Sequence, residues 1–242
     1  MTKTVFLAGA SGAIGKRLSK LLVADRWRVV GMTHTENKMD MLRELGVEPV
    51  CLDVFDPDKL KEAVAEAAPD VVIHQLTDLP PGLDPELMKE GAEKNARIWD
   101  VGTRNLIAAA SKTGARRLIA QSIAFVYDDG MLPHLESDPL KHRAKDETET
   151  TVRGVTSLEE QVVSAPMEGI VLRYGLLYGP GTGFDEPSGP TPLHVDAAAK
   201  AAHLAIKFGH RGIYNVAEDD GTVNSEKARR AFGWVPQFRI AN

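Results

Sequence analysis

The chain has 242 residues, of which 43% are hydrophobic and 26% charged, a composition typical of a globular protein with one substantial core. Its formal net charge is −5 and neither sign gathers in a long block, which argues against a general nucleic-acid binder. No apolar run approaches the roughly 20 residues of a membrane span, and the N-terminal segment is too short and too broken by glycine for a signal peptide, so we expect a cytoplasmic protein without a nucleic-acid or membrane partner.

Strand-like and helix-like patterns alternate in the first half of the chain, which is typical of crossover units that build a parallel sheet. Short apolar runs predict strands, and helical spacing of apolar residues predicts helices. The predicted strands cover residues 5–8, 28–32, 47–52, 71–73 and 117–121, and the predicted helices cover 14–24, 38–45, 56–67 and 86–112. Cys51 lies in the third of these strands. As the single cysteine it excludes an internal disulfide, and its apolar neighbours predict a buried thiol.

The second half of the chain is less regular. Residues 128–151 are rich in charged residues, proline and histidine, which predicts an exposed loop that could act as a lid. Further helices are predicted at 156–164, 195–208 and 225–231, and further strands at 169–174 and 212–216. We therefore predict an α/β fold, a doubly wound parallel sheet of about seven strands with helices on both faces.

A glycine-rich segment, Gly-Ala-Ser-Gly-Ala-Ile-Gly at residues 9–15, lies between the first strand and the first helix. Glycines at this spacing permit a tight turn, let backbone amides approach a pyrophosphate, and let the helix pack closely on the sheet. The N-terminus of the helix adds positive potential for the anion. The segment therefore predicts dinucleotide binding by Gly9, Ser11, Gly12, Ala13, Ile14 and Gly15.

The end of the second strand distinguishes the two nicotinamide cofactors. A carboxylate there binds the ribose hydroxyls of NAD, whereas a cation accepts the additional phosphate of NADP. No carboxylate stands at the diagnostic place, where the chain instead has His34 and Thr35, followed by Lys38. These three residues either bind the 2′-phosphate or are solvated surface residues, and we expect NADP(H) to be favoured over NAD(H).

Polar and backbone groups that follow the next two strands lie at the same edge of the predicted sheet. Asp53 and Val54 follow the third strand, where they either bind the adenine amine or, in the case of Asp53, cap the next helix. Gln75, Leu76 and Thr77 follow the fourth strand, where their backbone would meet the ribose or the pyrophosphate of a cofactor.

Further motifs occur in order along the chain: Gly-Thr-Arg-Asn-Leu at 102–106, Ser-Ile-Ala-Phe-Val-Tyr at 122–127, Leu-Arg-Tyr-Gly at 172–175, Tyr-Gly-Pro-Gly at 178–181 and His-Val-Asp at 194–196. With the glycine-rich segment and the Asp53-Val54 pair, they resemble the extended short-chain dehydrogenase/reductase superfamily and, more narrowly, its NAD(P)-dependent epimerase/dehydratase branch.

The resemblance implies a Rossmann fold, a bound nicotinamide dinucleotide, and redox chemistry on a hydroxyl or carbonyl group. It also implies that chains pair as a homodimer through the helices near 86–112 and 156–164. The residues it places beside the nicotinamide are Gln121, Ser122, Tyr174, Gly175, Leu176 and Leu177.

The catalytic residues of the superfamily are the first departure. Its chemistry needs a tyrosine as acid/base and a lysine four residues later, but none of the four tyrosines here is followed by lysine at that distance. The family tyrosine would fall near Thr151 or Val152, and the lysine near Val155 or Thr156. Ser122 and Tyr127 remain as catalytic candidates, each with a structural role as the alternative.

Other polar residues offer weaker candidates. Arg173 either contacts a substrate anion or forms a structural ion pair. His134, His142 and Lys145 are replacement acids or simply surface residues.

The second departure is an abbreviated substrate lobe. Only remnants near 179–195 and 217–242 remain of it, so we predict one NAD(P)-binding domain over residues 1–242. Three functions stay open. The leading one is an NAD(P)-dependent oxidoreductase that acts on a small carbonyl or hydroxyl substrate without the Tyr-Lys pair. The others are a non-catalytic NAD(P)-binding sensor and a sugar epimerase or dehydratase. No metal site is predicted.

Overall fold

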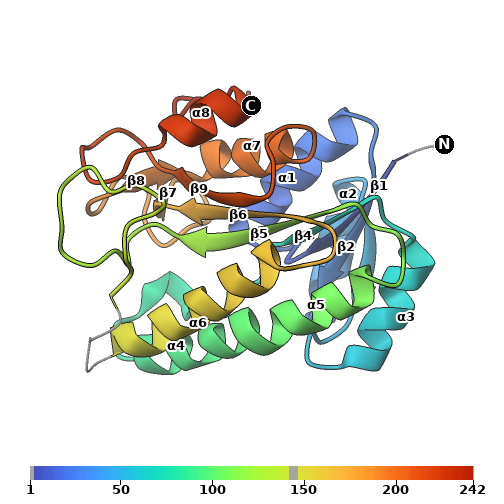
Figure 1. The fold of residues 1–242 in the computed structure, drawn as a ribbon. Coiled ribbons are helices and arrows are strands. Elements are labelled where there is room, and N and C mark those ends of the chain that lie inside the picture. Colours follow the sequence, from blue (N-terminus) through green and yellow to red (C-terminus); the bar gives the residue numbers. More distant parts are fainter. Residues whose placement is uncertain (1–2, 142–146, 242) are drawn as a thin grey trace.

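The computed structural model describes residues 3–141 and 147–241. Its main sheet has seven strands, all parallel, in the order β3-β2-β1-β4-β5-β6-β9 (Figure 1). The strands are β1 (Thr4–Ala8), β2 (Arg28–Thr33), β3 (Glu48–Cys51), β4 (Val71–His74), β5 (Arg117–Ile123), β6 (Glu168–Tyr174) and β9 (Gly212–Val216). The strand order runs outward from β1 in both directions, which confirms the predicted doubly wound sheet.

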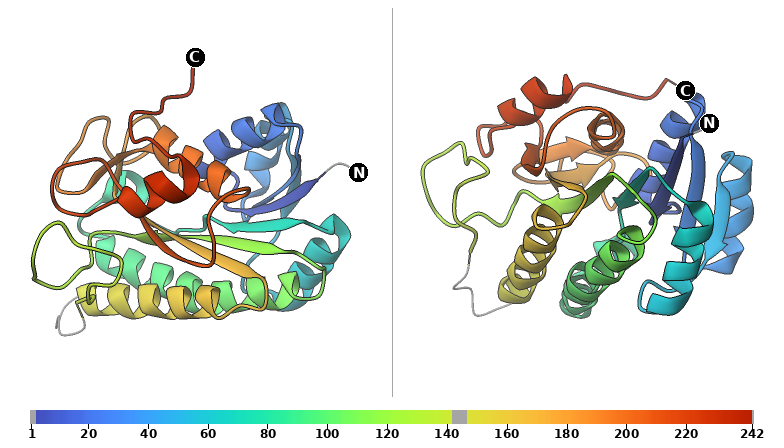
Figure 2. Two further views of the ribbon diagram at one scale, coloured as in Figure 1. Left: turned by 45° about the horizontal axis from the view of Figure 1, so that its top comes forward. Right: turned by 45° about the vertical axis from the view of Figure 1, so that its right-hand side comes forward.

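Helices cover both faces of this sheet (Figures 1 and 2). One layer contains α3 (Pro57–Ala67), α4 (Met88–Arg97), α5 (Thr103–Ala110) and α6 (Glu147–Val163), and the other contains α1 (Ala13–Ala24), α2 (Met39–Glu44), α7 (Val195–Ala205) and α8 (Glu226–Phe232). A π-helical turn, Ile98–Gly102, joins α4 to α5, so the predicted helix over 86–112 is one rod with a bulge. Short 3-10 turns lie at Glu36–Lys38 and Pro81–Leu83.

The central strands are buried on both faces because helices cover both sides, and their sequences are mostly apolar, with polar residues at the strand ends. Every residue of β1 and β4 is buried. Two apolar clusters result, one under each helical layer. The carboxyl ends of the strands therefore meet at one edge, where ligands bind in folds of this kind.

Three features differ from the sequence prediction. Helix α6 begins at Glu147, not near residue 156, because the interior positions Val152 and Val155 continue the buried stripe of Leu158 and Val162. A two-stranded parallel sheet, β7 (Leu176–Tyr178) with β8 (Pro192–His194), was not predicted. Cys51 is exposed rather than buried, because β3 is an edge strand with both outer residues open to solvent.

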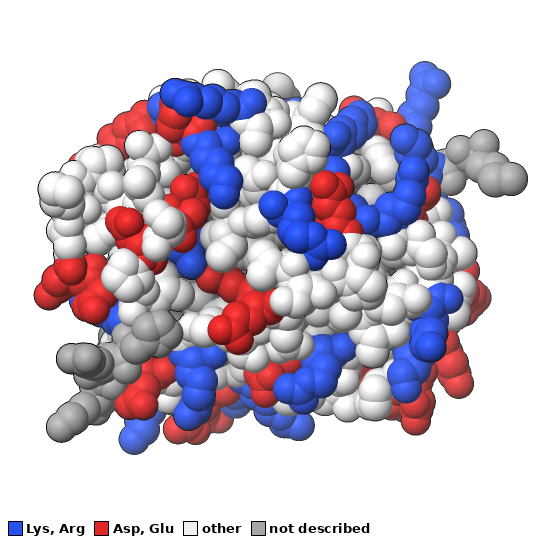
Figure 3. Space-filling model, viewed as in Figure 1, with Lys and Arg blue, Asp and Glu red and all other residues white. Residues whose placement is uncertain are grey.

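Charges of both signs alternate over the face of the molecule shown in Figure 3, without a large patch of one sign. Among residues 3–141 and 147–241, no helix is long and apolar enough to cross a membrane.

Candidate functional site

The glycine-rich segment forms the turn between β1 and α1, and its glycines fill positions where a side chain would not fit. Gly9 has φ of +88°, and a Cβ atom there would lie 2.5 Å from the carbonyl oxygen of Gln75. A Cβ atom at Gly15 would lie 2.1 Å from the carbonyl oxygen of Gly9. The turn is therefore compact because glycine is required at both positions.

Helix α1 begins at Ala13 with Gly12 as its N-cap, and no side chain of the described chain caps this end. Its first turn contains no acidic residue. The first amides of a helix lack intrahelical partners and carry positive potential, which suits a phosphate group. The residues present thus fit the pyrophosphate of a dinucleotide.

Ser11 connects this turn to the end of β2. Its hydroxyl lies 3.1 Å from the hydroxyl of Thr33, which also accepts a hydrogen bond from the backbone N–H of Thr35. His34 and Lys38 follow, and both side chains are exposed beside this pair. The structure therefore gathers hydroxyl groups, an exposed imidazole and an exposed lysine at the strand end that distinguishes the two cofactors.

The segment after β3 is held by hydrogen bonds of its own. Asp53 is exposed and accepts from the backbone N–H of Phe55, while Asp56, not Asp53, caps helix α3 through the N–H of Lys59. The carbonyl oxygen of Val54 accepts from the side-chain amide of Asn105. The carboxylate of Asp53 therefore remains at the surface of the sheet edge.

At the end of β4, His74 is fully buried, and its Nδ1 accepts from the N–H of Leu76. Burial lowers the pKa of His74 to about 4, which keeps it neutral near pH 7. Gln75 is buried and Thr77 is exposed at the edge. The histidine is therefore a structural part of the sheet.

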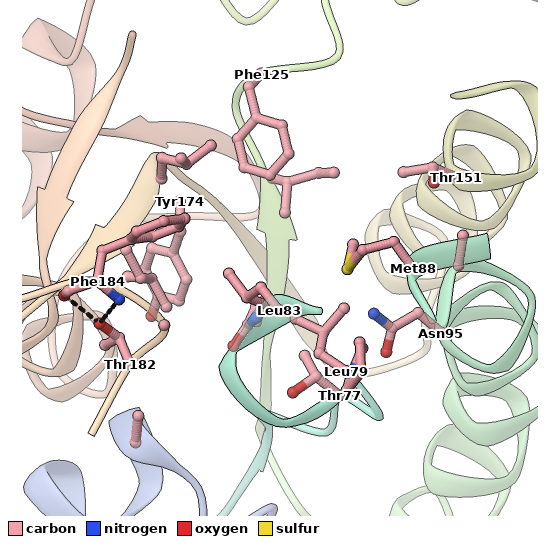
Figure 4. A pocket seen from close by; sticks show the side chains of 18 of the residues that line it. Thr77, Leu79, Leu83, Met88, Asn95, Phe125, Thr151, Tyr174, Thr182 and Phe184 are labelled. Carbon is pink, nitrogen blue, oxygen red and sulfur yellow. Dashed lines mark hydrogen bonds between the residues drawn. The ribbon is translucent and has the colours of Figure 1, made fainter. Parts of the chain in front are cut away.

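A pocket of about 500 Å³ opens at this edge, between the end of β4, helices α4 and α6, and the ends of β5 and β6 (Figure 4). It also reaches Ala13 in the first turn of α1, so it is continuous with the glycine-rich turn. The residues that line it are Ala13, Thr77, Leu79, Pro80, Gly82, Leu83, Met88, Ala92, Asn95, Trp99, Gln121, Ile123, Phe125, Thr151, Tyr174, Gly175, Leu176, Leu177, Gly181, Thr182, Gly183 and Phe184.

Most of these residues are apolar, and their polar side chains are neutral. Asn95 accepts from the backbone N–H of Asp78, and the Thr182 hydroxyl lies 2.8 Å from the carbonyl oxygens of Gly179 and Phe184. Tyr174 directs its hydroxyl to the carbonyl of Ala198, and burial raises the pKa of Tyr174. Thr151 occupies the wall where the spacing places the family tyrosine.

Sequence reasoning identified Ala13, Thr77, Gln121 and residues 174–177 of this pocket and missed most of the rest. Most of the missed residues come from the segment after β4, from α4 and from the loop after β7. Trp99 comes from the π-helical turn, and Ile123 and Phe125 come from the end of β5 and the segment after it. One signal was available: Leu79, Leu83 and Phe184 are apolar residues in segments rich in proline and glycine, where solvated polar side chains are usual.

Ser122 and Tyr127, the catalytic candidates, belong to a separate buried polar network. The Ser122 hydroxyl donates to Glu159 (2.7 Å), and Glu159 forms a bidentate ion pair with Arg173 (2.7 and 2.8 Å). Arg173 also donates to the Tyr127 hydroxyl (2.7 Å), which donates to Asn215 (2.6 Å).

Neither candidate lines the pocket, and their hydroxyls donate to Glu159 of α6 and Asn215 of β9. Burial raises the pKa of Tyr127, which makes it a poorer acid. Arg173 forms the structural ion pair rather than meeting a substrate anion. His134 is buried beside Asp138, and His142 and Lys145 lie outside the described residues.

Arg17 of helix α1 connects that helix to the start of α7 and to the loop after β7. Its Nε donates to Asp196 at the start of α7, and its Nη2 donates to the carbonyl of Pro180 (both 2.6 Å). This holds the loop that carries Thr182 and Phe184 against helix α1. Within the described residues, no group of His, Cys, Asp and Glu could hold a metal ion.

A family model described as NAD(P)H-binding matches residues 9–163, which span the glycine-rich turn, strands β2 to β5 and the whole of α6. A Streptomyces protein named 3-diazoavenalumate denitrifying reductase is 35% identical over 255 aligned residues, covering 97% of this chain and 80% of the relative. The chain belongs to the NAD(P)H-binding family. Its resemblance to the extended short-chain superfamily is thereby confirmed.

Solved structures agree on the fold. The UDP-glucose 4-epimerase of Thermotoga maritima, solved with UDP-glucose, superposes with a TM-score of 0.76 at 15% identity, covering 98% of this chain and 94% of the epimerase. The WbmH enzyme of Bordetella bronchiseptica, solved with NAD+, gives 0.71 at 19% identity, covering 97% and 93%. This chain thus shares its fold with both of these structures.

Proposed function

We propose that this protein is an NADPH-dependent reductase that delivers a hydride to a small, largely apolar substrate in the pocket of Figure 4. The observation that carries the proposal is the continuity of the pocket with the first turn of α1 through Ala13. A dinucleotide whose pyrophosphate lies on that turn would extend into the pocket, where its nicotinamide could meet a substrate.

The residues that would hold the cofactor follow from the same geometry. Amides of residues 9–15 would bind the pyrophosphate, and residues 75–77 would lie along the ribose. His34, Thr35 and Lys38 would bind the 2′-phosphate, and Asp53 and Val54 the adenine. Gln121 and residues 174–177 would flank the nicotinamide. Ser122 is left out because its hydroxyl is engaged by Glu159.

The reduced nicotinamide would supply a hydride from its C4 atom. Leu79, Leu83 and Phe184 would cover a bound substrate from water, and Leu176 and Leu177 would fix the plane of the ring. No step of this scheme uses Tyr127 or Ser122.

The Streptomyces relative supports reduction over epimerisation, because its name describes a reductase that acts on a diazo compound. We therefore propose two substrate classes for a first test: small carbonyl compounds, as the sequence resemblance implies, and small aromatic diazo compounds, as the relative suggests. The alternative of a non-catalytic sensor is favoured by the neutral lining of the pocket, since none of its described residues is Asp, Glu, Lys, Arg or His.

Calorimetric titration of nucleotide-free protein with NADPH, NADP+, NADH and NAD+ tests which cofactor the protein prefers. We expect binding of the phosphorylated pair to be stronger. His34→Ala and Lys38→Ala should each weaken NADPH binding about tenfold, since a hydrogen bond to a charged group contributes about 1.5 kcal/mol. NADH binding should not change.

Lys112→Ala is the matched control, because this exposed lysine precedes β5 at the opposite edge of the sheet. Equal affinity for NADH and NADPH would contradict the phosphate site. NADPH binding without oxidation by any carbonyl or diazo compound would favour the sensor.

Two structural proposals accompany the function. Residues 1–242 form one cofactor-binding domain, to which the lobe remnant at 179–195 contributes Thr182 and Phe184 of the pocket wall.

Two chains pair through the layer of α4, α5 and α6, which light scattering would detect as doubled mass.

A further inference from the structure

Three large apolar side chains around the pocket remain open to solvent. Leu79 is 42% exposed, Phe125 45% and Phe184 36%, and all three line this one cavity. They come from three separate segments, after β4, β5 and β7. Apolar side chains that gather from distant segments around one cavity mark a ligand surface.

Two of these three side chains, Phe125 and Phe184, are aromatic rings (Figure 4). Tyr174 and Trp99 also line the pocket, but they are only 1% and 4% exposed. Aromatic faces carry negative partial charge, so they stack on planar groups and attract organic cations. The walls therefore suit a flat ligand, and a positively charged one in particular.

The polar side chains that line the pocket are neutral, so none of them forms an ion pair with a substrate. The polar groups of the described lining residues are the threonine hydroxyls, the amides of Asn95 and Gln121, and the indole N–H of Trp99, which has no hydrogen-bond partner among the described residues. The Tyr174 hydroxyl already donates to the carbonyl of Ala198. A hydride added to a neutral ketone would form an alkoxide beside an oxidised nicotinamide. Opposite charges would thus be created in an apolar cavity that offers no acidic donor among these residues.

A cationic acceptor avoids this separation of charge. We infer that the pocket takes planar organic cations as hydride acceptors, namely iminium carbons conjugated to an aromatic ring. The inference rests on the proposed reductase function and narrows its substrate class.

In the balanced step, the hydride moves from C4 of the reduced nicotinamide to the iminium carbon, and a C–H bond forms. The π electrons of the C=N bond move to nitrogen, which gives a neutral amine. The nicotinamide is oxidised and takes over the single positive charge. No proton is needed.

Binding is tested with 2-methyl-3,4-dihydroisoquinolinium and with 1-tetralone, an uncharged ketone of the same shape. The protein is first loaded with 1,4,5,6-tetrahydro-NADPH, whose ring is neutral and donates no hydride. Calorimetry should show the cation binding at least tenfold more tightly than the ketone.

Two substitutions separate cation attraction from plain apolar contact. Phe125→Leu and Phe184→Leu should each weaken binding of the cation about fivefold and of the ketone less than twofold. Phe208→Leu, at an exposed phenylalanine outside the pocket, should change neither. Equal binding of both probes, or equal losses for both in the two pocket variants, would overturn the inference.

Turnover with NADPH gives the second test. The cation should be reduced with a kcat/KM at least 100-fold above that of the ketone, and with no dependence on pH between 6 and 9. Reduction of the ketone at a comparable rate would overturn the inference and leave the reductase function intact. If NADPH binds but neither probe nor any carbonyl or diazo compound is reduced, both the inference and the proposed function fail.

Discussion

Two groups of side chains lie at the carboxyl ends of β5 and β6 and differ in how their polar atoms are used. In the buried network, Ser122, Glu159, Arg173 and Tyr127 satisfy one another. In the neighbouring pocket, apolar and aromatic side chains remain open. We therefore propose that the residues that resemble catalytic groups stabilise the fold, while the described residues that line the pocket carry no charge.

The largest effect that would test this difference is expected at Glu159. Glu159→Ala leaves the Arg173 guanidinium buried without its counter-ion, and should lower the free energy of unfolding by about 3–5 kcal/mol. Urea denaturation measures this loss. The adjacent exposed Glu160→Ala should change stability by no more than about 0.5 kcal/mol. Equal effects would mean that the network does not stabilise the fold.

The lowered pKa of His74 predicts that the folded protein loses stability in acid. Its pKa is about 4 in the folded protein, against 6.5 ordinarily. Between these values the unfolded chain binds a proton that the folded chain does not, so the stabilisation is complete above pH 6.5 and is lost as pH falls towards 4.

We expect His74 to account for about 2–3 kcal/mol of the stability lost between pH 7.5 and 4.5, since each unit of pKa shift corresponds to about 1.4 kcal/mol. His74→Asn, which keeps an acceptor for the N–H of Leu76, should reduce the acid-induced loss by that amount. Urea unfolding at both pH values measures the difference. An unchanged pH dependence would show that His74 can be protonated within the fold.

Tyr127→Phe separates a structural from a catalytic tyrosine. The variant removes the hydroxyl that bonds Arg173 and Asn215, and should cost about 1–3 kcal/mol of stability. The kcat of the folded protein with its best acceptor should stay within about twofold. A loss of kcat above tenfold, with stability preserved, would instead make Tyr127 the acid.

The smallest effect on stability is expected in the pocket itself. Leu79→Ala should change the free energy of unfolding by no more than about 0.5 kcal/mol, because the side chain is already 42% exposed. It should raise the KM of an apolar acceptor about fivefold through lost contact area. Leu87→Ala, at a leucine 46% exposed outside the pocket, is the control and should leave KM unchanged.

The sequence predicted the first half of the fold because its signals are local. Glycines at 9, 12 and 15 fix the first turn, and uninterrupted apolar runs mark the buried strands. The sequence prediction was wrong where tertiary packing determines the bounds of an element. The first turns of α6, from Glu147, are polar and rich in threonine, so its apolar stripe begins only at the buried residues Val152 and Val155.

The candidate site shows the same division. The cofactor edge could be read from motifs, since each residue follows a strand directly. The direction of the Ser122 and Tyr127 hydroxyls could not, because it depends on Glu159 and Asn215, 37 and 88 residues further along the chain. The apolar pocket walls come from distant loops that carry no motif.

The most direct test of the reductase proposal is the fate of the hydrogen at C4 of NADPH. Protein is incubated with NADPH deuterated at C4, as each of the two stereoisomers, and with the isoquinolinium cation and the carbonyl and diazo compounds in turn. We predict that one stereoisomer transfers deuterium to carbon in the product of at least one acceptor. Products whose new C–H hydrogen comes only from water, or no product at all with NADPH bound, would contradict hydride transfer in this pocket.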